Sequence, residues 1–256
     1  MKGIRPRGHA DRERVVRKLV PAPRQKFGDN LIAVAAQASF ARGDDAAYSD
    51  LEITVFLREM PKELPAGWTS AIRDGLLIEI WFTTRDDYIA HIKDVTDEWY
   101  IAGSDVILPV VNKPFLDELA ALALPDLRER IVRRAVRLWP GLQEDVTKTL
   151  NAVDAGNRDG LPMVLFYLMK DALAMLAFLN GKPYTTLGRY IPQARQFPVK
   201  PDRFDEFLDI MVDGSYTDLK ELREIVVGMF EGFERLFEER GVALYPYGRL
   251  PGEDER

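Results

Sequence analysis

The sequence contains no cysteine and only two histidines among its 256 residues. The absence of cysteine excludes disulfides, thiolate zinc sites and a cysteine nucleophile. Because so little imidazole is present, we expect any metal site to be built from carboxylates. Carboxylate oxygens favour a hard cation such as Mg2+.

Long apolar runs and an excess of basic residues are also missing. No apolar stretch reaches the roughly 18 residues of a membrane span, and the first ten residues lack the apolar core of a secretory signal. The formal net charge is −6, whereas nucleic-acid binders usually have a basic surface. We therefore expect a cytoplasmic protein with no membrane or nucleic-acid partner.

The pattern of apolar residues changes near the middle of the chain. Alternation predicts a strand at 50–57, and apolar runs predict strands at 31–36 and 76–82. We also expect a fourth strand or extended segment at 105–111, helices at 10–20 and 86–94, and a polar turn at 38–49. Helical periodicity then predicts helices near 126–138, 142–153, 162–180, 185–195, 203–213 and 216–240. The prediction is an α+β protein, with a mixed sheet and flanking helices in 1–125 and a helical domain in 126–256.

Two carboxylates, Asp50 and Glu52, stand two residues apart in a predicted strand. Such residues project to the same side, with α-carbons roughly 7 Å apart. Like charges this close need a cation nearby, and magnesium bridging the phosphates of a nucleotide would provide it. Ser39 and Arg42 lie just upstream and could contact a terminal phosphate. The ordinary alternative is a solvated strand face after a polar loop.

Glu79 is the only charged residue in the apolar run LLIEIWF at 76–82. An unpaired carboxylate in a buried strand is costly, so Glu79 needs a partner. A neighbouring strand that carries a metal or a cationic substrate would supply one. The alternative interpretation is a rim position at the edge of a sheet.

Several segments of the sequence match a known family. They are ASFARGDDAAYSDLE (38–52), Trp68-Thr69, Ile78-Glu79, Ile107-Leu108-Pro109, Pro183-Tyr184-Thr185-Thr186 and the stretch at 215–242. On these residues the chain resembles the kanamycin nucleotidyltransferases, aminoglycoside-modifying enzymes of the polymerase-β-like nucleotidyltransferase superfamily. The similarity runs from about residue 10 to 245.

The resemblance implies a nucleotidyltransferase sheet followed by a C-terminal helical bundle, in a homodimer with active sites near the interface. It implies that Asp50 and Glu52 hold magnesium and that Glu52 and Glu79 face the sugar substrate. It assigns nucleotide binding to Ser39, Arg42, Ser49, Lys148 and Thr186.

For the catalytic base, the resemblance implies a glutamate on a helix of the second domain, followed four residues later by a lysine that contacts phosphate. Glu144 and Lys148 keep that spacing. An i, i+4 Glu–Lys pair is also the commonest ion pair on a helix surface, and Asp145 is the competing base if the alignment shifts by one residue. For Thr186 the alternative is an ordinary helix N-cap.

The sequence departs from the family at several positions. Ala38 replaces a glycine, which is tolerated only if φ stays negative there. Gly67 replaces an acidic residue, and Pro140 and Gly141 replace two more just upstream of the base. These changes leave the metal site intact but reduce the number of acidic side chains available to bind a polyamine sugar.

We therefore expect magnesium-dependent transfer of a nucleoside monophosphate from ATP or another NTP to a hydroxyl of an aminoglycoside such as kanamycin, which would confer antibiotic resistance. Two alternatives remain. One is the same chemistry on another small-molecule or protein hydroxyl. The other is a catalytically idle dimer that binds a nucleotide.

Overall fold

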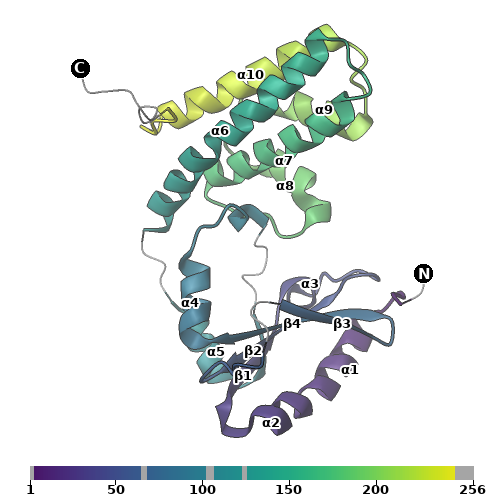
Figure 1. Ribbon diagram of the computed structural model, residues 1–256, viewed down its shortest axis with the longest axis vertical. Helices are drawn as coiled ribbons and strands as arrows, with labels where there is room; N and C mark the ends of the chain where they lie inside the picture. The colour runs from purple at the N-terminus through teal and green to yellow at the C-terminus, as the bar shows by residue number, and fades with distance from the viewer. Residues whose placement is uncertain (1–2, 65–67, 102–106, 123–125, 246–256) are drawn as a thin grey trace. The chain divides into compact units, whose positions relative to one another are not determined.

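The computed structural model describes residues 3–64, 68–101, 107–122 and 126–245 (Figure 1). The chain divides into two compact units, Met1–Asp94 with Ala102–Pro125 and Val95–Ile101 with Asp126–Arg256. The short segment Val95–Ile101 thus groups with the second unit, although the sequence division at 125 places it in the first part. Gly67 and the first two residues of the extended segment predicted at 105–111 lie outside the described residues.

The first unit is built on a five-stranded mixed sheet in the order β3-β4-β2-β1-β5. The strands are β1 Leu31–Ala36, β2 Leu51–Leu57, β3 Trp68–Arg73, β4 Leu76–Thr84 and β5 Leu108–Val111. β2 and β4 are parallel, and the other pairs are antiparallel. The mixed sheet is confirmed. The edge strand β3 was not predicted, because its residues lack an apolar alternation.

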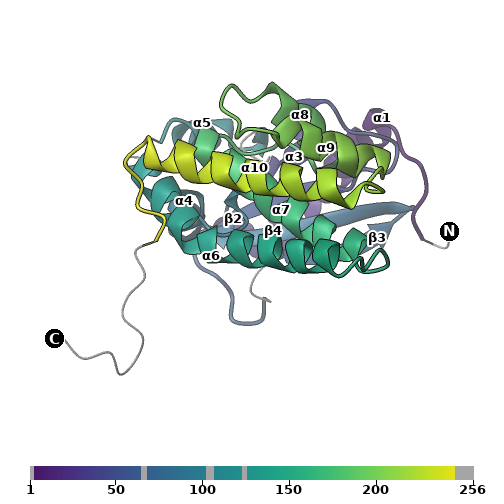
Figure 2. The ribbon, with the colours of Figure 1, turned by 90° about the horizontal axis from the view of Figure 1, so that it is seen from above.

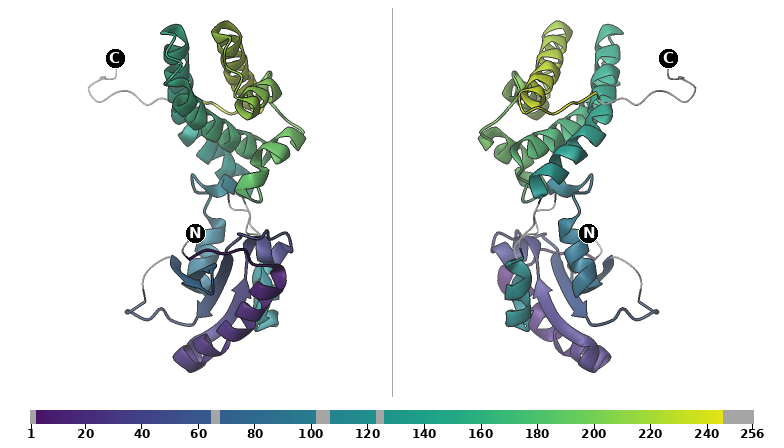
Figure 3. Two further views of the ribbon diagram at one scale, coloured as in Figure 1. Left: turned by 90° about the vertical axis from the view of Figure 1, so that its right-hand side faces the viewer. Right: turned by 90° about the vertical axis from the view of Figure 1, so that its left-hand side faces the viewer.

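Helices cover both faces of this sheet (Figures 1 and 3). On one face, α1 His9–Leu19 and α2 Pro21–Phe27 pack over the odd-numbered apolar residues of β2. On the other, α4 Arg85–Lys93 and α5 Lys113–Ala120 pack over Phe56. The polar and apolar alternation predicted for β2 therefore ends after Glu52, because Thr54 and Phe56 are fully buried.

The helix predicted at 10–20 is confirmed as α1, and Pro21 and Pro23 lie in the first turn of the next helix, α2, where proline is well tolerated. One local prediction in the first unit is wrong. The predicted polar turn at 38–49 starts with a short helix, α3 Ala38–Arg42, that buries Phe40.

The second unit contains five α-helices among the described residues (Figure 2). They are α6 Leu127–Asp154, α7 Leu161–Asn180, α8 Tyr190–Gln196, α9 Phe204–Asp213 and α10 Leu219–Glu238. α6 packs against α7 and α10, and one large apolar cluster fills the space between them. The helical C-terminal region is therefore confirmed.

A single helix, α6, replaces the two helices predicted at 126–138 and 142–153. Pro140 lies inside it. Proline in a helix interior costs about 3 kcal/mol. The buried side chains on either side of Pro140, including Ala135, Trp139, Leu142 and Val146, follow helical spacing and bury one continuous face. The packing of that face outweighs the local cost.

α7 is the apolar helix at the centre of the second unit. Among the described residues it alone is long and apolar enough to cross a membrane, with a mean hydropathy of 1.6 over an 18-residue window. The window is 56% buried in the structure, and it includes Lys170 and Asp171. Such burial is also found in the core helix of a bundle.

Candidate active site

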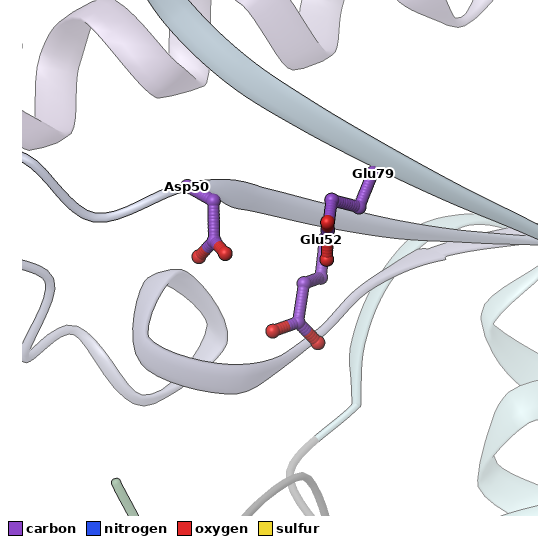
Figure 4. Close-up of side chains that lie close together, drawn as sticks. All are labelled: Asp50, Glu52 and Glu79. Carbon is purple, nitrogen blue, oxygen red and sulfur yellow. The ribbon is translucent and has the colours of Figure 1, made fainter. Parts of the chain in front are cut away.

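Three carboxylates, Asp50, Glu52 and Glu79, meet at the start of β2 (Figure 4). One oxygen from each lies within 4.8 Å of the others. Glu52 and Glu79 are direct neighbours in the parallel ladder between β2 and β4, and Asp50 immediately precedes β2. β3 pairs on the outer side of β4, so the alternative interpretation of Glu79 as a sheet-edge residue is wrong.

The electrostatics of this cluster favour a bound cation. Burial, followed by the charges of Asp50 and Glu79, raises the pKa of Glu52 to about 7, against the opposing effect of Arg42. Burial also raises the pKa of Glu79, followed by the charge of Asp50. Three oxygen ligands with excess negative charge are the donor set that Mg2+ prefers. The residues present therefore fit the magnesium site expected from the sequence.

Mg2+ binding should depend on pH near neutrality. Because Glu52 has a pKa of about 7, it must lose a proton before it can bind the metal. We expect the Mg2+ concentration for half-saturation to be about 10-fold higher at pH 6 than at pH 8, as for competition with one proton. Thermal unfolding at increasing Mg2+ concentrations would measure this. Equal affinity at both pH values would contradict it, and Glu52→Gln should remove the pH dependence.

Ser39 and Arg42, the expected phosphate contacts, both lie on α3. The Arg42 Nε lies 3.3 Å from Asp44 Oδ1, and the positive charge of Arg42 lowers the pKa of Glu52. Arg42 is therefore close enough to the carboxylates to act on them. The Ser39 backbone carbonyl accepts from the Asp44 N–H at 3.1 Å, which ties the start of the following loop to α3.

Ala38 adopts a φ of +54°. An alanine in place of the family's glycine is tolerated here only with a negative φ, and the observed φ does not meet that condition. The left-handed region crowds the β-carbon against the backbone, which costs roughly 1–2 kcal/mol for residues other than glycine. The backbone at this position keeps a conformation suited to glycine although its residue is alanine.

Ala38→Gly should therefore stabilise the protein. We expect a gain of about 1 kcal/mol, because glycine relieves the left-handed strain at some cost in chain entropy. Denaturant unfolding of the metal-free protein measures this. Ala41→Gly in the same short helix is the matched control. Ala41 has no positive φ, so the control should lose about 0.5–1 kcal/mol. A loss of stability in both variants would contradict the strain at Ala38.

Ser49 is held within the loop that leads to Asp50. Its hydroxyl accepts from the Ala46 N–H at 2.9 Å, and its carbonyl accepts from Arg12. Sequence reasoning missed Arg12 and its partner Asp45. One signal was available, since Arg12 lies four residues before Val16 on the apolar face of the predicted helix.

On α6, Glu144 and Lys148 form an exposed ion pair, with 2.7 Å between Nζ and Oε1. Asp145 differs from its neighbour, because it is packed toward Asp171 of α7. Burial raises the pKa of both aspartates, and the charge of Asp171 adds to the effect on Asp145. Sequence reasoning did not find Asp171.

Thr186 precedes the 3-10 turn Leu187–Arg189 without a side-chain cap hydrogen bond, so it does not make the N-cap contact given as its alternative role. Its neighbour Thr185 is bound by Gln193. The Thr185 N–H donates to Gln193 Oε1 at 3.0 Å, and Gln193 Nε2 donates to Thr185 Oγ1 at 2.8 Å. The Thr186 hydroxyl takes no part in these two hydrogen bonds.

The first unit has a mixed sheet with the D-x-E carboxylates at the start of one strand, a third carboxylate on the next strand, and a serine and an arginine on a short helix upstream. This is the arrangement expected of a nucleotidyltransferase. The KNTase C-terminal domain family matches residues 120–243 of this chain. The chain is 19% identical, over 245 residues, to an aminoglycoside nucleotidyltransferase (4') from Staphylococcus aureus and to one from a Bacillus species. Each alignment covers 94% of this chain and 96% of the relative.

Among solved structures, a nucleotidyltransferase-like protein from Exiguobacterium sibiricum aligns with a TM-score of 0.49 and 10% identity. The alignment covers 88% of this chain and 75% of that one. The family match and the two sequence relatives confirm the resemblance to the kanamycin nucleotidyltransferases. The protein is a nucleotidyltransferase related to that family.

Proposed function

We propose that this protein transfers a nucleoside monophosphate from ATP, or another NTP, to a hydroxyl of an aminoglycoside such as kanamycin. The observation that carries the proposal is the meeting of Asp50, Glu52 and Glu79 within 4.8 Å. The two relatives are named for aminoglycoside nucleotidyl transfer.

In this proposal, Asp50, Glu52 and Glu79 hold Mg2+. When bound, the cation neutralises charge on the transferring phosphoryl group. Ser39 and Arg42 bind phosphate oxygens, with Ser49, Thr186 and Lys148 as further nucleotide contacts. The acceptor oxygen forms a bond to the α-phosphorus, the bond to the bridging oxygen breaks, and pyrophosphate leaves. Glu144 takes the proton of the attacking hydroxyl.

The face of the sheet that carries the carboxylates has side chains that could bind an amino sugar, which combines positive charge with an apolar ring face. Trp81 follows Glu79 by two residues, and Trp68 lies opposite Trp81 in the ladder, so all three project from one face. The two indoles stack with centroids 5.8 Å apart, and Trp68 is 47% exposed. Aromatic faces attract cations. Aromatic rings beside carboxylates therefore support an amino sugar as acceptor.

In the second unit, a carboxylate from another helix compensates for the acidic residue that is missing at position 141. Gly141 stands where the family has an acidic residue, and a β-carbon built there would lie 3.4 Å from Asp171 Oδ2. The Asp171 carboxylate thus lies close to the place that an acidic side chain at position 141 would occupy. Asp145 lies beside Asp171. This pair supports a polyamine acceptor over a neutral one.

We also propose a cytoplasmic homodimer. The apolar side chains Phe233 and Phe237 of α10 do not support the dimer, because they are buried within the second unit. α7 supports it better, since Met163, Phe166 and Tyr167 share one helical face and are 49–62% exposed. Light scattering should give twice the chain mass of 29.2 kDa. A mass near 29 kDa at all concentrations would refute the dimer.

The decisive experiment incubates the purified protein with Mg2+, α-labelled ATP and a panel of aminoglycosides, with kanamycin first. We expect label to pass to the aminoglycoside and pyrophosphate to appear in equal amount. Pyrophosphate release only with other hydroxyl compounds would support the alternative acceptor. ATP binding without any transfer would support the idle nucleotide-binding dimer.

A further inference from the structure

Arg12 is a fully buried arginine on α1. Its guanidinium donates five hydrogen bonds. Nη1 donates to the Arg7 carbonyl (2.9 Å) and Asp45 Oδ2 (2.8 Å), Nη2 to the Ala46 carbonyl (2.8 Å) and the Ser49 carbonyl, and Nε to the Ser49 carbonyl (3.2 Å). Four of these five bonds go to the segment 45–49, which immediately precedes Asp50.

The partners of Arg12 are held in turn by a second contact from α1. Asp45 is 1% exposed, and His9 Nδ1 lies 2.6 Å from its other carboxylate oxygen. The His9 ring stacks on Phe40, with ring centroids 4.7 Å apart. Phe40 lies between Ser39 and Arg42 on α3. α1 therefore contacts both α3, which carries Ser39 and Arg42, and the loop that precedes Asp50.

We infer that Arg12 is a positioning residue that orients Asp50 for cation binding by fixing the Ser49–Asp50 peptide. Two N–H groups of one rigid guanidinium converge on the Ser49 carbonyl, which is the carbonyl of that peptide. This fork fixes the direction of the carbonyl as well as its position. The inference rests on the proposed function for its role in transfer, whereas its effect on metal affinity can be measured without any acceptor.

A purely stabilising role would not require this arrangement. Buried ion pairs can often be replaced at little cost by apolar residues of similar volume, and the rest of the α1 face packs through Val16 and other apolar side chains. Arg12 instead satisfies backbone carbonyls of a segment without regular structure. Groups that orient metal ligands from outside commonly change metal affinity or activity 10–100-fold when replaced.

The test is Arg12→Lys, which keeps the charge near Asp45 but loses the fork to the Ser49 carbonyl. The probe is Mn2+, titrated into the full chain and followed by electron paramagnetic resonance. We expect about 10-fold weaker Mn2+ binding. In the transfer assay, kcat should fall about as far, and the KM for the acceptor should change less than about twofold. Arg14→Lys is the control, since Arg14 lies on the same helix but is exposed and paired with Asp11.

Mn2+ affinity within twofold of the wild type in folded Arg12→Lys would overturn the inference. If that variant does not fold, His9→Ala is the deciding variant, because the His9 side chain is 46% exposed and its loss removes contacts only to Asp45, Phe40 and the exposed Glu13. Weaker Mn2+ binding by His9→Ala supports the inference, and unchanged binding overturns it. Wild-type protein that binds Mn2+ but transfers nothing contradicts the proposed function and leaves the positioning role intact.

Discussion

Glu52→Gln should abolish nucleotidyl transfer, with turnover lower by about 10³, because it removes a ligand of the cation that stabilises charge on the transferring phosphoryl group. The same substitution should stabilise the metal-free protein. Burial and two neighbouring carboxylates raise the pKa of Glu52 from 4.5 to about 7, so the folded state binds this proton more tightly than the unfolded chain. Ionisation therefore removes stability as the pH rises from about 4.5 to 7, up to roughly 3 kcal/mol.

The measurements are transfer at saturating Mg2+ and denaturant unfolding without metal at pH 5 and pH 8. The gain in stability should be larger at pH 8, where Glu52 of the wild type is ionised. Asp50→Asn should also abolish transfer. Glu59→Gln, at an exposed position just after β2, is the matched control and should change neither quantity. Full activity of Glu52→Gln would rule out this metal site, and a less stable variant at pH 8 would contradict the electrostatic account.

Glu144→Gln should lower turnover by about 10² or more, the usual range for loss of a general base, with little change in ATP binding. A sugar hydroxyl is a poor nucleophile until a carboxylate accepts its proton. Glu144 has an exposed carboxylate, 64% accessible, and it pairs with Lys148 at 2.7 Å. We propose that Lys148 stabilises the negative charge that develops on the phosphate.

Asp145→Asn is the matched comparison on the same helix and should be mild. Its carboxylate is partly buried against Asp171, which suits a contact to a cationic acceptor better than proton transfer. The expected signature of Asp145→Asn is a higher KM for the acceptor with kcat nearly unchanged. If Asp145→Asn loses turnover and Glu144→Gln keeps it, Asp145 is the base. Normal turnover by both would place the base elsewhere.

The central strands and the acidic cluster could be predicted because their signals are local. β1, β2 and β4 are short segments rich in apolar residues, and the D-x-E spacing alone directs Asp50 and Glu52 to one side. Glu79 stood out because a lone charge in an apolar run needs a partner. The two halves of the chain also differ in periodicity, which distinguished the sheet from the helices.

Other features have no local signal, and only the tertiary structure decided them. The parallel register that sets Glu79 beside Glu52 depends on pairing between distant segments. Arg12 acquires its role only when α1 packs against the loop before Asp50. Pro140 is accepted because its helix buries a continuous face on both sides of it.

The amino-acid sequence by itself determined the chemical groups of the site, the strands that carry the D-x-E pair and the family that the chain resembles. The tertiary structure decided the positive φ of Ala38, the neighbours of Glu79 and the anchoring of the loop by Arg12. The physical reason is that periodicity and spacing act over a few residues. Backbone strain, strand register and burial of a charge are set by the free energy of the whole packed unit.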